Sequence, residues 1–176
     1  MDLGHNHLTS VPDELGHLAD LRGCLYLHDN DLTEISDALG NLTRLRYLNV
    51  GENGLTTLPE TVSRMAGLIE LRVQHNRLTT LPDGIGYLHS LRELWLRGNA
   101  VESLPPSMAD LRELRHLDLR ENALAELPEV LADLPGSATS MCAATASRDS
   151  RTGSSTCLRW RSWTCVGTPA SLPHRC

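Results

Sequence analysis

The sequence predicts an α/β solenoid in which short parallel strands alternate with short helical or 3-10 turns. Leucines recur at fixed offsets along most of the chain, so each turn carries the same apolar set. A repeat of about 20–29 residues with this leucine spacing indicates stacked turns, because one repeat cannot bury its apolar face alone. Six asparagines mark the repeat, and the last five of them are 23 residues apart: Asn6, Asn30, Asn53, Asn76, Asn99 and Asn122.

The repeat formed by residues 45–67 shows why each element is expected. Leu48 and Val50 alternate with outward residues, which is the period of two of a short strand with one buried face. Asn53 follows where the chain must turn, and its amide can bond backbone groups there, so stacked asparagines can form a ladder. Pro59 ends regular structure, and the apolar residues after it have the i,i+3 spacing of a helical or 3-10 return.

Two irregularities interrupt the period. Asn6 and Asn30 are 24 residues apart, so one extra residue precedes Leu25, and we expect a β-bulge near Gly23. Ser36 stands where the other repeats have proline. Because serine does not fix the backbone as proline does, we expect a looser turn there.

The repeat is seen in full from residue 68, as L-I-E-L-R-V-Q-H-N-R-L-T-T-L-P. This pattern resembles the leucine-rich repeat family in its 23-residue L-x-x-L-x-L-x-x-N-x-L-x-x-L-P version, as found in intracellular bacterial proteins and Ras-group scaffolds. The resemblance covers residues 1–136, about six repeats with the first one truncated. It implies a curved right-handed horseshoe with parallel strands on the concave face and short turns on the convex face. It also implies protein–protein binding as the usual role.

The segment from residue 137 to 176 does not continue the pattern. Small polar residues, arginine, cysteine and tryptophan dominate it, without a period of two or of 3.6, and we expect a disordered tail. Back-translation with GC-rich codons, read one base earlier, gives strings such as L-D-V-R-G-N-R-L-T-R-L-P. We therefore hypothesise that the chain from about residue 136 is a frameshifted translation, which sequencing the coding DNA would test.

Charge and composition exclude several classes of function. Residues 1–136 hold 21 acidic residues and 11 arginines, a net charge of −10, so we expect no nucleic-acid partner. No stretch approaches the roughly 18 apolar residues of a membrane span, and we expect no membrane partner. The N-terminus lacks a basic region followed by an apolar run, which predicts a cytoplasmic protein with reduced thiols.

Catalytic and metal-binding motifs are absent from the sequence. It contains no G-x-S-x-G, no Walker loop and no H-E-x-x-H, and we expect neither an enzyme nor a cofactor. The eight histidines and five cysteines do not have the spacing of zinc ligands, so we expect no metal.

The outward strand positions form the candidate binding surface, because tyrosine, tryptophan and arginine dominate binding hot spots. Trp95 among Arg72, Arg97 and Arg120 is the sharpest cluster. The alternative is a solvated face with cross-strand pairs such as Glu70–Arg97 or Glu93–Arg72. The candidate residues are Tyr26, Tyr47, Asn49, Glu70, Arg72, Glu93, Trp95, Arg97, Asp118 and Arg120.

The sequence is compatible with three kinds of function. In the first, the chain is a non-enzymatic interaction module or signalling scaffold that binds a folded or extended protein partner through its concave face. In the second, it is the targeting fragment of a larger enzyme or effector whose catalytic domain is missing. In the third, it is a degraded gene product. We expect a monomer, with end-to-end association through uncapped ends as the alternative.

Overall fold

The computed structural model describes residues 1–126, 128–132, 134 and 140–143, the last four and residue 132 by their backbone. Of the segment 137–176 it thus describes one short strand. The predicted disorder and frameshift otherwise concern residues that lie outside the described part of the chain.

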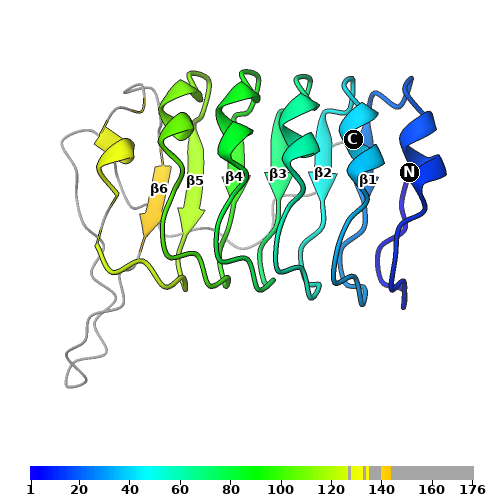
Figure 1. Ribbon diagram of the computed structural model, residues 1–176, viewed down its shortest axis with the longest axis horizontal. Helices are drawn as coiled ribbons and strands as arrows, with labels where there is room; N and C mark the ends of the chain where they lie inside the picture. The colour runs from blue at the N-terminus through cyan, green and yellow to red at the C-terminus, as the bar shows by residue number, and fades with distance from the viewer. Residues whose placement is uncertain (127, 133, 135–139, 144–176) are drawn as a thin grey trace.

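The chain winds into successive coils that stand side by side in sequence order (Figure 1). Each coil pairs a strand with a 3-10 helix, and the strands form one parallel sheet, ordered from β1 to β6. This confirms the predicted α/β solenoid. The strands are β1 (Cys24–Tyr26), β2 (Tyr47–Asn49), β3 (Glu70–Arg72), β4 (Glu93–Trp95), β5 (His116–Leu119) and β6 (Ser140–Ala143). The helices are η1 (Asp13–His17), η2 (Asp37–Asn41), η3 (Glu60–Arg64), η4 (Asp83–Tyr87), η5 (Pro106–Asp110) and η6 (Glu129–Ala132).

The sheet places equivalent residues of successive repeats in rows. From β1 to β5 each strand residue pairs with the equivalent residue of the next repeat, so Leu48 pairs with Leu71 and Leu71 with Leu94. All of these leucines are fully buried. The inward residues of every coil join into one continuous apolar core, as a solenoid requires. Within the described part of the chain, no helix is long and apolar enough to cross a membrane.

The repeated asparagines bond the backbone, as predicted. Asn76 Nδ2 donates to the carbonyl oxygens of Val50 and Val73, at 3.0 and 3.1 Å, and its Oδ1 accepts the N–H of Leu55 at 2.9 Å. The ladder therefore runs from side chain to backbone, across two neighbouring coils. Four other asparagines make the same set of bonds: Asn30, Asn53, Asn99 and Asn122.

The bulge expected near Gly23 does not interrupt the ladder. β1 pairs with β2 residue for residue from Cys24 onward. The extra residue is accommodated before the strand, in the connection where Gly23 bends. A Cβ on Gly23 would meet no atom within 4 Å, so this connection has room for the insertion.

The looser turn expected at Ser36 is also wrong. Ser36 has φ −62°, close to the −66° of Pro59 at the equivalent position. Its Oγ accepts the N–H of Ala38 at 3.0 Å and donates to the carboxylate of Asp13. These hydrogen bonds cap η2 and hold the turn that a proline ring fixes elsewhere.

Candidate functional site

The strand face consists of the outward-pointing residues of β1–β5. Along each strand a buried leucine lies between two residues of this face, which is the alternation that the period of two predicts. All ten candidate residues lie in these strands or within two residues after them. The face is therefore assembled from the positions that the sequence indicates.

Rings and one guanidinium stack in a continuous row across this face. The ring centroids of Tyr26 and Tyr47 are 5.1 Å apart. Arg72 Cζ lies 5.6 Å from the centroid of Tyr47 and 5.1 Å from that of Trp95, so the cation is held between two aromatic faces. The rings of Trp95 and His116 follow, at 4.1 Å. We call these five residues the stacked row; it crosses all strands from β1 to β5.

Two histidines extend the row beyond Tyr26. The ring of His28 lies 5.8 Å from that of Tyr26, and the ring of His5 lies 4.5 Å from that of His28. His5 Nδ1 is also 2.7 Å from a carboxylate oxygen of Asp29. The repeat spacing places both His28 and His116 at outward strand positions, although neither is among the ten candidate residues.

Carboxylates fix the large side chains of the face. Arg72 Nε donates to Glu70 at 2.5 Å, and Trp95 Nε1 donates to Glu93 at 3.2 Å. Arg97 Nη2 bonds Glu121 at 2.6 Å. Arg72 and Arg97 thus take other partners than the cross-strand pairs of the alternative interpretation. Residues two apart on one strand lie on the same face, which makes Glu70 the nearest carboxylate for Arg72.

Two of the candidate residues are buried within the face. Asn49 is 3% exposed, and its Oδ1 accepts the N–H of Gly51 at 3.0 Å. Asp118 is 1% exposed, and its carboxylate accepts bonds from the guanidinium of Arg120, the shortest at 2.5 Å. Both side chains therefore orient their neighbours instead of projecting toward solvent.

The row contains polar atoms that the described residues do not satisfy. Tyr47 Oη and His116 Nε2 are buried and have no hydrogen-bond partner in the described part of the chain. Burial raises the pKa of the Tyr47 hydroxyl, although the nearby Arg72 acts in the opposite direction. Burial lowers the pKa of His116, opposed by the Glu93 carboxylate. At neutral pH both groups are uncharged.

The sequence also predicts a reduced thiol at Cys24 and the absence of a metal site. Among the described residues, no group of three or more His, Cys, Asp or Glu could hold a metal ion. Cys24, at the start of β1, is disulfide-bonded, so the reduced thiol that we expected there is wrong.

The repeats identify the family. Residues 2–99 match the family model described as a leucine-rich repeat region. The chain therefore belongs to the leucine-rich repeat family. No curated protein sequence matches the chain significantly.

Several solved structures share the fold. A leucine-rich repeat protein of Leptospira interrogans is 26% identical with a TM-score of 0.61, covering 79% of this chain and 42% of that one. A second structure is the ectodomain of the Arabidopsis thaliana receptor kinase GASSHO1/SCHENGEN3 in complex with CASPARIAN STRIP INTEGRITY FACTOR 2. It is 33% identical with a TM-score of 0.70, and the match covers 81% of this chain and 18% of that one. A third structure is an octameric complex of FLRT2 with Latrophilin 3 and Unc5D. Its leucine-rich repeat chain is 33% identical with a TM-score of 0.67, and the match covers 79% of this chain and 43% of that one. The chain spans less than half the length of each.

Proposed function

We propose that the chain is a non-enzymatic module that binds a protein partner through its concave strand face. The observation that carries this proposal is the stacked row. Tyr47, Arg72 and Trp95 are large, half-buried side chains already fixed by stacking and by carboxylates. Anchors held in place before binding lose little conformational entropy on association, and Tyr, Trp and Arg are the residues that contribute most at interfaces.

The unsatisfied atoms favour a partner with hydrogen-bonding groups. The Tyr47 hydroxyl keeps its proton, because burial raises its pKa, and it can donate to a partner carbonyl once the side chain turns outward. His116 Nε2 is a second buried polar atom at the other end of the row, which a partner reaches in the same way. Similar solved structures include complexes with other proteins, which agrees with the same general role here. A polypeptide laid across the strands would meet apolar rings and polar atoms in turn.

Capture of partners by the immobilised chain tests the proposal. The double variant Arg72→Ala/Trp95→Ala removes the centre of the row. The matched control, Arg64→Ala/Tyr87→Ala, removes an arginine and a ring from η3 and η4, where Tyr87 is 66% exposed. We expect the strand-face variant to lose a partner that wild type and control retain, with Kd weakened by about 30-fold or more.

Circular dichroism and urea unfolding of both variants confirm that each remains folded. Retention of the same partner by the folded strand-face variant, at wild-type affinity, would contradict the proposal.

A further inference from the structure

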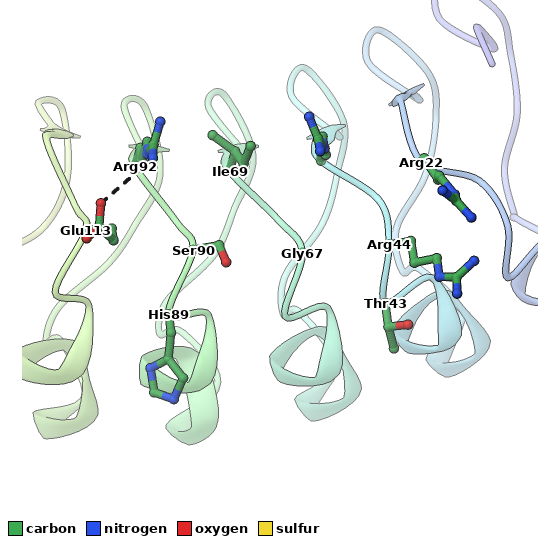
Figure 2. A pocket seen from close by; sticks show the side chains of 10 residues that line it. Arg22, Thr43, Arg44, Gly67, Ile69, His89, Ser90, Arg92 and Glu113 are labelled. Carbon is green, nitrogen blue, oxygen red and sulfur yellow. Dashed lines mark ion pairs between the residues drawn. The ribbon is translucent and has the colours of Figure 1, made fainter.

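A basic groove lies away from the strand face, along the edge where each coil leaves its 3-10 helix and approaches the next strand. Figure 2 shows it spanning several coils, and its volume is about 890 Å³. Four arginines and one glutamate line it, a formal charge of +3 on a solenoid that carries −10 over residues 1–136. The arginines are Arg22, Arg44, Arg46 and Arg92.

The charges of this groove are only partly neutralised by the protein itself. Arg44 bonds Asp20 at 2.8 Å, while Arg92 lies 3.9 Å from Glu113, a loose pair (Figure 2). Arg22 and Arg46 are exposed, and among the described residues no carboxylate forms an ion pair with either. Their guanidinium groups are therefore available to carboxylates of a ligand.

The middle of the groove holds a glycine, Gly67, and one apolar side chain, that of Ile69. A Cβ on Gly67 would lie 2.7 Å from the carbonyl oxygen of Thr43, and the Gly67 N–H donates to that oxygen at 3.0 Å, so the close approach requires glycine. Ile69 is half-buried at the position that Arg46 and Arg92 occupy in the adjacent coils. The backbone shows this equivalence: Ile69 N–H donates to Arg46 O, and Arg92 N–H donates to Ile69 O. The apolar side chain of Ile69 thus lies between arginines of the two adjacent coils.

We propose that this groove binds an extended acidic segment of another protein, with an apolar residue between two acidic ones. Neighbouring parallel strands are about 4.8 Å apart, so the backbones of Arg46 and Arg92, two coils apart, are about 10 Å apart. An extended chain in the polyproline II conformation advances about 3.1 Å per residue with three residues per turn, so acidic residues three apart point the same way and match this distance. Each carboxylate meets a guanidinium while the apolar side chain between them covers Ile69.

The charge of the whole solenoid favours a peptide over nucleic acid. A polynucleotide carries a charge on every residue and would be repelled by the net negative charge of residues 1–136. A peptide with a few acidic residues places charge only where the arginines lie.

Fluorescence anisotropy with a labelled synthetic peptide that repeats Glu-Thr-Leu tests the inference on the whole chain. A Gln-Thr-Leu peptide tests the need for charge, and a Glu-Thr-Ser peptide tests the need for the apolar residue. The variant Arg46→Gln/Arg92→Gln is compared with Arg64→Gln/Arg77→Gln, which removes the same charge outside the groove. Trp95→Ala serves as an independent check of the strand face.

We expect the Glu-Thr-Leu peptide to bind wild type at least about tenfold more tightly than either comparison peptide. The groove variant should lose at least tenfold, while the control arginine variant and Trp95→Ala stay close to wild type. Three results would overturn the inference: no binding of Glu-Thr-Leu, equal losses in the two arginine variants, or tighter binding of single-stranded DNA. Loss of binding in Trp95→Ala alone would assign the peptide to the strand face instead.

Discussion

At the scale of single residues, the asparagine that follows each strand has the strictest hydrogen-bonding role in the repeat. Asn76 is 8% exposed and links two coils through bonds to Val50, Val73 and Leu55. Asn76→Ala would leave buried backbone groups without partners, at about 1–3 kcal/mol for each unsatisfied group. We expect the free energy of unfolding, measured in urea, to fall by about 2–4 kcal/mol.

Thr57 offers a matched control, because it is an exposed polar residue of a neighbouring coil. Thr57→Ala should change stability by less than about 0.5 kcal/mol. Equal stabilities of the Asn76 and Thr57 variants would show that water replaces the ladder and that the asparagines are not structural.

His116 makes the stability depend on pH. Because burial lowers its pKa below 6.5 in the folded state, the unfolded chain binds this proton more readily. Its contribution to stability is therefore fully present above about pH 6.5 and is lost as the pH falls below that value. We expect the urea midpoint to drop between pH 7.5 and 5.5, and to drop less in His116→Gln.

His89 is exposed and provides the comparison for that experiment. His89→Gln should keep the wild-type dependence on pH. If His116→Gln also keeps it, the titration belongs to other groups, and His116 does not couple protonation to folding.

Which residues belong to the face could be predicted from the sequence, but their contacts could not. A period of two and a repeat of 23 residues place Tyr47, Arg72 and Trp95 on one side of one sheet. The insertion of the Arg72 guanidinium between two rings depends on side-chain torsions, which no spacing specifies. The burial of Asn49 and Asp118 likewise depends on the bulk of the side chains around them.

At the scale of the element, neighbouring 3-10 helices approach so closely that several need glycine. A Cβ on Gly86, in η4, would lie 2.1 Å from the carbonyl oxygen of Ser107, in η5. Gly16 and Gly40 meet the carbonyls of Ala38 and Thr61 in the same way. Gly86→Ala must push two helices apart, and we expect it to cost about 1–3 kcal/mol in the free energy of unfolding.

Gly23→Ala is the control for Gly86→Ala, since a Cβ there meets nothing within 4 Å. It should leave stability unchanged or raise it slightly, because alanine restricts the unfolded chain. A Gly86 variant as stable as the Gly23 variant would mean that the helices separate at no cost, and that their packing does not set the spacing of the coils.

Both errors of prediction at this scale arose from reading a repeat by itself. The insertion before β1 was expected to bulge the strand, and Ser36 was expected to loosen its turn. In the structure, pairing with β2 keeps β1 in register, and Asp13 of the preceding coil holds Ser36. Contacts between coils override local preferences, because each element is stabilised mainly by its neighbours.

At the scale of the whole molecule, the repeat turns sequence positions into surfaces. A residue and its equivalents at intervals of 23 form one row, so a change in one repeat alters one site within that row. The stacked row combines members of two adjacent rows, and the basic groove combines members of neighbouring rows on another side of the coils. The leucine pattern predicts the scaffold. The surfaces are distinguished by residues that differ from their equivalents in other repeats, namely Trp95 in the stacked row and Gly67 and Ile69 in the groove.

The same architecture predicts that stability varies along the chain, since in a solenoid each coil contacts only its neighbours. His5 and His75 are equivalent residues, both with left-handed backbone before the repeated asparagine. Each amide donates to the next coil, His5 to His28 O at 3.0 Å and His75 to Arg97 O at 2.8 Å. The asparagine after His75, Asn76, is buried, whereas Asn6 after His5 is exposed. We expect hydrogen exchange at neutral pH to be slower at the His75 amide, because local opening around His5 disrupts fewer buried contacts. Equal protection of the two amides would mean that the solenoid opens as one cooperative unit, with coupling between coils stronger than the stability of any single coil.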